Sequence, residues 1–452
     1  MQHGRASVSA TPKSHSLRRR HRSAGMRSTS QRGGLLLGVL LVAQLMVILD
    51  ITAVNIALPS LATELDLTGS SISWTITSYS LIFGSLLLFG GRAADLLGRR
   101  RMFLTGLGIF TVSSFASAMA GTAAALFAAR AGQGLGAALL SPAALAIIMS
   151  TFQGGRRAKA LAAWGAVGGA GAAIGVLVGG ILTELTDWRM IFYVNLPVAA
   201  ALAIAARTII PADTEKPGLV AFALLERRAR TPLLRVERLA DRAVGGGLVL
   251  MLAAAGSIFG LFLLSSLYLQ NVLGWGPLAT GLAFIPLALA AGAGAHASGH
   301  IVGKHGVRAP LAGAFLVAAA GMTLLAQVGE NGSYVRDVLP GMLVAGLGLG
   351  VAVVAVAIAV LAGARDEESG MISGLSSTGH EIGGTIGIAI FSTIAAGGGA
   401  VAGPQAASGI ADAFGAAAVI ASVAGVVALA VLPRARHFVP KLRLSPSTMP
   451  SH

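Results

Sequence analysis

The chain has no cysteine, and charged and aromatic residues are scarce, at 11% and 5% of its 452 residues. Without cysteine there can be no disulfide bond, thiol nucleophile or cysteine metal site. Soluble proteins carry about 25% charged residues, so this low charged share, with 55% hydrophobic residues and a mean hydropathy of +0.78, excludes a soluble globular protein. The composition instead predicts an integral membrane protein built from α-helices.

Most of the chain consists of long runs of apolar residues. A helix needs roughly 20 residues to cross a hydrocarbon core, and twelve runs reach that length. They cover residues of about 34–59, 71–91, 101–121, 122–150, 158–183, 189–210, 243–269, 277–298, 307–328, 335–363, 370–396 and 411–433. The sequence therefore predicts twelve membrane-spanning helices.

Lysine and arginine lie almost entirely in alternate connections between these runs. When the connections are assigned in turn to two sides, one side holds 30 of the 33 basic residues, and the other holds only Arg189 and Arg336. Arg130 alone lies deep within a run, away from its ends. Because basic loops stay in the cytoplasm, this asymmetry predicts an even number of spans with both termini cytoplasmic. It also explains the net charge of +15 without a nucleic-acid partner, and we expect none.

The same pattern divides the chain into five segments. Residues 1–33 carry eight Lys and Arg and no acid, which predicts a disordered basic cytoplasmic tail that sets the topology; contact with lipid or nucleic acid is the alternative. Met26 is an alternative start. The other segments are a six-helix bundle at 34–210, a cytoplasmic linker at 211–242, a second six-helix bundle at 243–433 and a cytoplasmic tail at 434–452.

A glycine- and arginine-rich turn, GRAADLLGRRR, connects the second and third runs. It resembles the loop between helices two and three of the major facilitator superfamily. Glycine tolerates the positive φ of a tight turn, and an aspartate here can bind an arginine or a helix N-terminus. The resemblance implies two six-helix bundles around a central cavity, with this loop acting as a cytoplasmic gate. The matching residues are Gly91, Asp95, Gly98, Arg99 and Arg100.

Asp50 and Arg130 are ionisable residues within the runs, where a charge is costly enough to suggest a function. Asp50 lies about 14 Å, and Arg130 about 12 Å, from the outer end of its run, at a helical rise of 1.5 Å per residue. If the two runs are neighbours, we expect these residues to pair, with Arg130 keeping Asp50 ionised until a proton or cationic substrate competes. The alternative is a permanent ion pair that fixes helix register.

His380 and Glu381 lie in the eleventh run, roughly 15 Å deep and near the midplane. Histidine titrates near neutral pH, and a desolvated glutamate can take up a proton in the same range. This dipeptide is therefore a second candidate proton relay; a hydrogen-bonded contact between the bundles is the alternative. The zinc motif H-E-x-x-H fails at Gly384, and we expect no metal and no cofactor, with the proton as coupling ion.

The fifth run is rich in glycine at intervals of three, seven and four residues. Small residues on one side of a helix allow another helix to approach closely in a membrane. We expect a packing seam formed by Gly165, Gly168, Gly175 and Gly179.

Several segments also resemble the drug:proton antiporters of the EmrB/QacA type, a branch of that superfamily usually drawn with fourteen spans. The likeness extends from about residue 34 to 430 and rests on LDITAVNIALP, SWTITSYSL, RAGQGLGAALLSP and WRMIFYVNLP. In this branch the arginine of the fourth-helix motif is implicated in proton coupling, which implies such a role for Arg130 and Gln133. Asn55 of the first-helix motif is a further coupling or substrate candidate.

The sequence departs from that branch at two places, which concern the antiporter motif of the fifth helix and the number of spans. Val176 follows Gly175 where the helix-five motif has proline, so the local kink lacks its usual cause. The segment at 222–242 looks like the one that follows two extra helices in fourteen-span relatives, and those helices are missing here. The resemblance therefore implies twelve spans.

Together these features predict a secondary transporter of the plasma membrane that exports small amphipathic compounds or drugs in exchange for protons, by alternating access between two bundles. A dedicated exporter or importer of one metabolite, such as an amino acid, sugar or siderophore, is the alternative within transport; a receptor or scaffold is the alternative outside it. No nucleophile–base set is visible, so we expect no enzyme. We expect a monomer that contacts the lipid bilayer, a small-molecule substrate and protons.

A reporter that fluoresces only in the cytoplasm tests the topology when it is fused after His452. Fluorescence is expected, because an even number of spans returns the C-terminus to the side of the basic N-terminal tail. A C-terminus on the outer face would contradict the count of twelve.

Overall fold

The computed structural model describes residues 13–67, 70–213, 242–362, 369–397 and 403–432. Within these ranges the regular elements are all helical, as the composition predicts. Most of the predicted linker and the whole predicted C-terminal tail lie outside the described residues.

The helices follow the twelve apolar runs in order. Runs six, seven, eight and ten are each divided between two consecutive elements, and the other eight are single helices. The elements are α1 (Lys13–Glu64), α2 (Ser70–Leu97), α3 (Arg99–Ala118), α4 (Ala123–Thr151), α5 (Gly154–Leu185), α6 (Met190–Tyr193), α7 (Asn195–Ile209), α9 (Arg242–Leu267), η2 (Tyr268–Val272), α10 (Pro277–Ala283), α11 (Ile285–His305), α12 (Arg308–Leu325), η3 (Tyr334–Val338), α13 (Leu339–Ala362), α14 (Ser369–Gly397) and α15 (Ala406–Val431).

Most of these helices satisfy the length and hydropathy that a membrane span requires. Among the described residues, nine spans do so, and the two parts of α5, Gly154–Gly168 and Ala173–Leu185, which meet at 41°, supply a tenth. The remaining two of the twelve runs are α3, which packs against α4, and α14, which packs against α9. The chain is thus an all-α protein with many helices that can cross a bilayer.

The first helix begins earlier than predicted. α1 starts at Lys13, so residues 13–33 are helical where the sequence predicts disorder. A helix nucleated in the apolar span extends at the gain of one hydrogen bond per residue, and no proline interrupts residues 13–33. The predicted disorder is therefore wrong for that segment, and residues 1–12 lie outside the described residues.

The predicted turn between the second and third runs is also shorter in the structure. α2 continues to Leu97, so Gly91 and Asp95 are helical rather than part of a loop. Only Gly98 leaves the helix, with a φ of 102° that favours glycine. Alanine and leucine dominate the segment before Gly98 and are strong helix formers, which accounts for the difference.

Asp213 holds the N-terminus of α3. Its carboxylate accepts hydrogen bonds from the backbone N–H of Arg100 (3.2 Å) and of Arg101 (3.0 Å), where the helix dipole favours an anion. Asp95 instead pairs with Arg99 one turn further on, at 3.3 Å. The start of α3 is thereby tied to the segment that follows α7.

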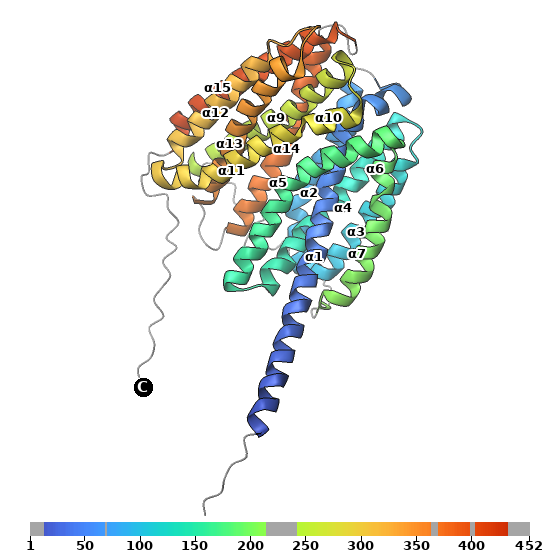
Figure 1. The fold of residues 1–452 in the computed structure, drawn as a ribbon, viewed down its shortest axis with the longest axis vertical. Coiled ribbons are helices and arrows are strands. Elements are labelled where there is room, and N and C mark those ends of the chain that lie inside the picture. The colour runs from blue at the N-terminus through green and yellow to red at the C-terminus, as the bar shows by residue number, and fades with distance from the viewer. Residues whose placement is uncertain (1–12, 68–69, 214–241, 363–368, 398–402, 433–452) are drawn as a thin grey trace, which may run out of the picture.

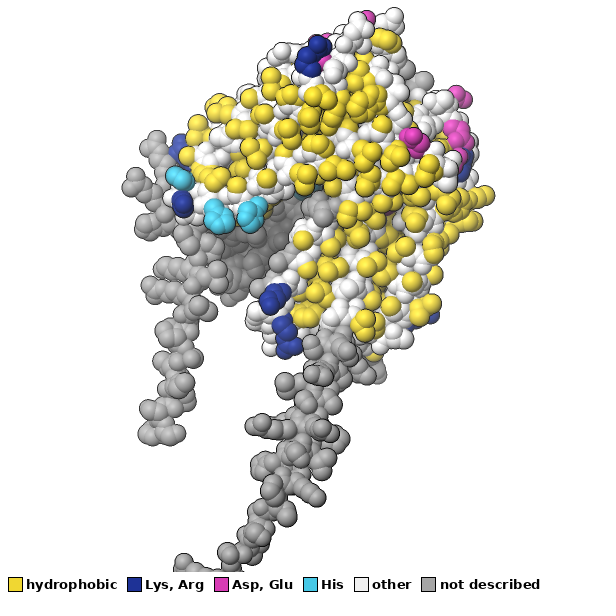
Figure 2. Space-filling view, viewed as in Figure 1, with side chains coloured by type: hydrophobic (Ala, Val, Ile, Leu, Met, Phe, Trp, Pro, Cys, Tyr) yellow, Lys and Arg dark blue, Asp and Glu magenta, His cyan; other side chains and the backbone are white. Residues whose placement is uncertain are grey.

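The helices form two groups, α1 to α7 and α9 to α15 (Figure 1). Phe103 and Phe110 belong to the buried core of the first group, and Phe315 and Phe414 to that of the second. Hydrophobic side chains cover the flanks of both groups in Figure 2, while charged ones gather toward the ends. This is the surface that helices present to lipid.

We call the end of the molecule that carries Arg99, Arg156 and Lys304 the basic end, and the other the opposite end. The two groups touch at the opposite end. Gln270 Nε2 donates to the backbone oxygen of Ile56 at 3.1 Å. The backbone N–H of Leu278, in α10, donates to the Glu184 carboxylate of α5 at 2.8 Å.

Toward the basic end, α5 and α11 diverge (Figure 1). At the opposite end α5 is in close contact with α10, the element before α11, because a Cβ on Gly180 would lie 2.6 Å from the backbone oxygen of Pro277. In Figure 2 the described residues of the two groups separate on this side. α2 and α14 remain in contact, with Gly84 against the Glu381 side chain. The structure is therefore closed at the opposite end and open between α5 and α11 at the basic end.

Of the four glycines of the predicted seam, two face α1 and two face open space. A Cβ on Gly179 would lie 2.7 Å from Ala53 Cα, and Gly175 likewise packs on α1. Nothing lies within 4 Å of the corresponding point at Gly165 or Gly168. The 41° bend of α5 accounts for the difference, because these two glycines belong to the part before the bend.

Glycine also permits the close crossing of α3 and α4. A Cβ on Gly106 would lie 2.6 Å from the backbone nitrogen of Leu140 and 2.7 Å from the backbone oxygen of Gly136. Because neither backbone can yield, Gly106→Val is expected to lower the free energy of unfolding by about 1–3 kcal/mol. Unfolding in detergent measures this, with Gly108→Val on the same helix as control, since Gly108 faces open space. Equal losses in both variants would contradict the crossing.

Candidate functional site

A buried ion pair joins α1 to α4. Arg130 Nη1 donates to Oδ2 of Asp50, and the exposed fraction of both side chains is 0%. The structure thus brings together the two residues whose depths in the sequence match. Isolated charges in such surroundings would cost several kcal/mol each, so each residue requires the other.

Two side-chain amides donate hydrogen bonds to Oδ1, the second carboxylate oxygen of Asp50. Gln133 Nε2 donates to Asp50 Oδ1 at 2.8 Å, and Asn195 Nδ2 donates to the same atom at 3.0 Å. Both amides also contact Ser114 Oγ, at 2.8 and 3.0 Å. Four helices, α1, α3, α4 and α7, therefore contribute to one site built around a negative charge.

The rest of the arginine packs against aromatic rings. Its guanidinium carbon lies 4.5 Å from the ring centroid of Tyr79 and 5.7 Å from that of Phe192, within cation–π range. Its Nε donates to the backbone oxygen of Thr75 at 3.2 Å. Nη2 is buried without a hydrogen-bond partner among the described residues. Arg130 thus keeps one donor group available for another acceptor.

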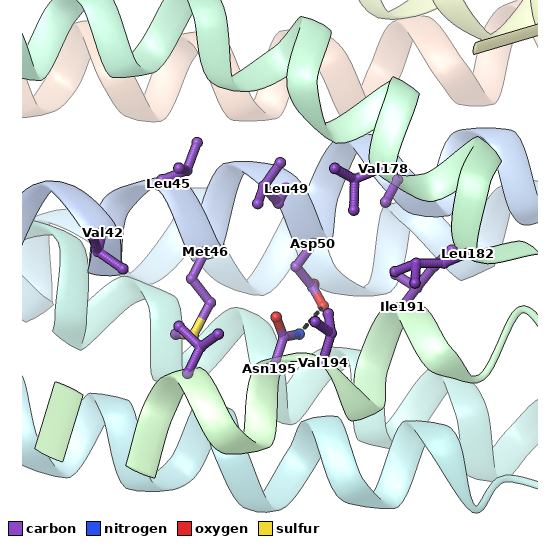
Figure 3. Close-up of a pocket in the computed structure, with 12 residues that line it drawn as sticks. Val42, Leu45, Met46, Leu49, Asp50, Val178, Leu182, Ile191, Val194 and Asn195 are labelled. Atoms are coloured by element: carbon purple, nitrogen blue, oxygen red, sulfur yellow. Dashed lines mark hydrogen bonds between the residues drawn. The ribbon is translucent and has the colours of Figure 1, made fainter. Parts of the chain in front are cut away.

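A cavity of about 180 Å³ borders Asp50 among α1, α5, α6 and α7 (Figure 3). In Figure 3, Asn195 lies beside Asp50 and bonds to it from the cavity wall. Ten of the twelve lining residues are apolar, so the cavity suits hydrocarbon better than water. The lining residues are Val42, Leu45, Met46, Leu49, Asp50, Ala53, Val178, Leu182, Ile191, Val194, Asn195 and Val198.

His380 and Glu381 lie where the two groups meet. The His380 ring packs edge-on against Phe259, with centroids 5.7 Å apart. Oε2 of Glu381 is buried and has no hydrogen-bond partner among the described residues. The Tyr79 hydroxyl is also buried without a hydrogen-bond partner among the described residues. Tyr79 belongs to α2, which packs against α4 in the first group and α14 in the second.

Asn55 does not join the ion-pair network. Its amide nitrogen donates to the backbone oxygen of Ile51 in the same helix at 3.1 Å, and its amide oxygen is buried without a partner in the described part of the chain. Its backbone oxygen accepts a bond from Ser266 at 3.3 Å. Asn55 therefore belongs to the contact between the groups.

Sequence reasoning missed Ser114, Asn195 and Tyr79. Each is a polar residue inside an otherwise apolar run, which is the signal that could have identified it. The motif WRMIFYVNLP contains Asn195, but only the fold shows that this residue meets Asp50. Within the described residues there is also no group of three or more acidic or histidine side chains that could hold a metal ion.

Residues 40–388 match the Major Facilitator Superfamily. The chain belongs to the Major Facilitator Superfamily. It is therefore a membrane transporter and not an enzyme. The all-helical fold of the described residues agrees with this assignment.

Three relatives show which members of the superfamily the chain is similar to. It is 37% identical to the puromycin resistance protein of Streptomyces alboniger over 408 residues, which is 79% of this chain and 81% of the relative. It is 29% identical to a cephamycin export protein of Amycolatopsis lactamdurans, over 82% and 87% of the two chains. It is 28% identical to a lincomycin resistance protein of Streptomyces lincolnensis, over 83% and 87%.

Solved structures show the same fold at much lower identity. A D-xylose–proton symporter matches with a TM-score of 0.73 and 15% identity, over 88% of this chain and 98% of that one. A bacterial homolog of the lysosomal transporter Spinster, inward-facing and occupied, matches with a TM-score of 0.69 and 16% identity, over 87% and 96%. The helices of this chain are thus arranged in the fold that these structures share.

Substitutions in the Asp50–Arg130 pair are expected to change the free energy of unfolding in a characteristic way. Arg130→Met leaves Asp50 as an uncompensated buried charge, so the free energy of unfolding is expected to fall by about 3–5 kcal/mol. The double variant Asp50→Leu, Arg130→Met removes both charges and should recover most of that loss. Thermal or denaturant unfolding in detergent measures both. A double variant no more stable than Arg130→Met would show that the amide network, rather than the charge pair, carries the stability.

Proposed function

We propose that this transporter exports small amphipathic compounds, with antibiotics as the leading class, in exchange for protons. Three similar relatives are named for resistance to or export of puromycin, cephamycin and lincomycin. These are chemically unlike one another, which favours a site that accepts amphipathic molecules broadly. The single observation that supports the coupling is the fully buried Asp50–Arg130 pair, in which Arg130 Nη2 has no hydrogen-bond partner among the described residues.

The pair supplies a chemical basis for proton coupling. While Asp50 is ionised, it holds Arg130 by charge. A proton on Asp50 removes that attraction but leaves the arginine cation buried, so the guanidinium gains by turning toward another acceptor. Proton binding thereby favours a different packing of the helices that carry these residues. Alternating access requires such a change between two packings.

Glu381 is the acceptor that the second group offers. Its Oε2 is buried without a partner among the described residues, and α14 packs against α2, whose Tyr79 ring centroid lies 4.5 Å from the Arg130 guanidinium carbon. A carboxylate without a partner in a membrane interior is stabilised by a proton or by a cation. We assign the proton to Asp50 and Glu381 in turn, and His380, which packs on Phe259, to a supporting position beside Glu381.

The distribution of basic residues gives the orientation of the protein in the membrane. Basic loops stay in the cytoplasm, so the basic end faces the cytoplasm and the structure is open to it. The proposal places the protein in the plasma membrane as a monomer with cytoplasmic termini. A protein open to the cytoplasm is ready to load a compound for export.

Purified protein in liposomes tests this function. With an imposed pH gradient, the native chain is expected to move puromycin or other amphipathic drugs against the movement of protons, measured by drug uptake and by a pH-sensitive dye. Asp50→Asn keeps the hydrogen-bonding shape but cannot take up a proton, so gradient-driven transport should fall to background. Glu381→Gln should reduce it as well.

Asp412→Asn is the matched control, because Asp412 is an exposed acid on α15 far along the chain from the site. It should transport like the native chain. If Asp50→Asn still responds to the gradient, coupling does not pass through the buried pair. If the gradient drives no drug but does drive a single sugar, amino acid or siderophore, the protein is a dedicated carrier.

A further inference from the structure

Two histidines lie one turn apart on an exposed face of α11. His296 and His300 are four residues apart, and residues at this separation are neighbours on one face of a helix. Both residues are exposed, and their ring centroids are 5.7 Å apart. The two imidazoles therefore form a pair that can be reached from outside the helix.

The histidine pair lies within a segment, Pro277–His305, that is long and apolar enough to cross a membrane. Counted from the helix end at His305, His300 is about 8 Å deep and His296 about 14 Å deep, at a rise of 1.5 Å per residue. Ionisable side chains within membrane spans face the protein interior or water rather than lipid. Figure 2 shows histidines at the edge of the second group, where the described residues of the two groups separate. We therefore expect the pair to meet water that enters from the basic end.

Glycines leave space around the pair. Gly292, Gly299 and Gly303 each lie three or four residues from His296 or His300 along the helix. Nothing lies within 4 Å of the Cβ position at any of these glycines. A small ligand with its bound water molecules can therefore approach the imidazoles without displacing a side chain.

The spacing of the two imidazoles suits a shared metal ion. Neutral imidazole is the commonest metal ligand in proteins, and histidines four residues apart on a helix bind zinc together in H-E-x-x-H motifs. Two zinc–nitrogen bonds of 2.0–2.1 Å place the nitrogens at most about 4.2 Å apart. Rings whose centroids are 5.7 Å apart can each turn one nitrogen toward such an ion.

We propose that His296 and His300 bind a divalent transition-metal cation such as Zn²⁺ or Ni²⁺. Imidazole suits these metals, whereas Mg²⁺ and Ca²⁺ prefer oxygen ligands. Cysteine, the other strong protein ligand for zinc, is absent from the chain. This site differs from the sequence-based expectation of no metal, which considered the motif at His380 and not this spacing. It does not depend on the proposed function, because it uses neither the Asp50–Arg130 pair nor Glu381.

The metal site would be open rather than closed. Structural zinc sites have four protein ligands, but the part of the chain that the structure describes contains no group of three or more acidic or histidine side chains able to hold a metal. His305 does not extend the pair, because it lies five residues after His300 and its Nδ1 contacts the backbone oxygen of Ile301 at 3.2 Å. Two positions of a tetrahedral ion thus remain for water or for a donor atom of another molecule.

Metal titration of the purified full chain tests the site. The chain is prepared in detergent with an affinity tag that contains no histidine, treated with a chelator, and titrated with Zn²⁺ or Ni²⁺ in a calorimeter. The native chain is expected to bind one ion more than the variant His296→Ala, His300→Ala. Electron paramagnetic resonance of added Cu²⁺ should show two nitrogen ligands that the variant lacks.

A matched control keeps the composition of the chain and breaks the spacing. The variant Ala295→His, His296→Ala places its histidine five residues from His300, so the two imidazoles no longer share a face. It should lose the ion as the double alanine variant does. His305→Ala removes an exposed histidine from the same helix and should keep the ion. The chain's remaining histidines are present in every variant, so binding to them cancels in the comparison.

Thermal unfolding without metal should be the same in all these chains, because exposed substitutions away from packing contacts have small effects on stability. If the native chain and the variant Ala295→His, His296→Ala bind the same number of ions with the same affinity, the pair is not a metal site. Loss of the ion in His305→Ala would also overturn a site made by two histidines. Metal binding by a native chain that moves no drug in a pH gradient would count against the proposed function alone.

Discussion

A pair of opposite charges without access to water organises the first group of helices. Asp50 and Arg130 are fully shielded, and the remaining oxygen of Asp50 is bound by amides of Gln133 and Asn195. Each buried charge is tolerable only because the other neutralises it. The positions of α1, α3, α4 and α7 are therefore linked through one carboxylate. Any event that neutralises this carboxylate must disturb all four helices.

The same helix that carries the carboxylate also carries a contact between the two groups. Ile56 accepts a hydrogen bond from Gln270, and Asn55 accepts one from Ser266, less than two turns beyond Asp50 on α1. A rotation or shift of α1 that follows protonation of Asp50 would therefore reach the closed end directly. This short mechanical path is a physical reason for a transporter to place its charge pair on that helix.

Buried polar groups also lie where the second group meets the first. The core of the second group is close-packed around α13, and Gly383 and Gly387 press α14 onto α9. Yet Glu381 of α14, in the second group, and Tyr79 of α2, in the first, each bury an oxygen that has no hydrogen-bond partner among the described residues. Buried polar atoms are normally paired, so the contact between α14 and α2 is where the proposed mechanism has polar groups that can take a new partner.

Much of the site could be anticipated from residues alone. The scarcity of charge makes each buried ionisable side chain conspicuous, and equal depths made Asp50 and Arg130 a natural pair. Asn195 and Ser114 could not be found in this way, because many polar residues in apolar runs bond only to their own helix, as Asn55 does. The bend in α5 could not be predicted, because no proline lies at it. Gly165 and Gly168 come before the bend and therefore do not face α1.

By itself, the sequence determined the membrane setting, the number and order of the helices and the few charges they bury. It could do so because lipid excludes charges and unpaired backbone groups. Each span must therefore be long, apolar and helical whatever helices lie beside it, and these properties can be recognised in the sequence. Only the tertiary structure decided which polar groups meet the carboxylate and which end is open. Those outcomes depend on side-chain contacts between helices far apart in the chain, and on a choice between two packings that one sequence must allow.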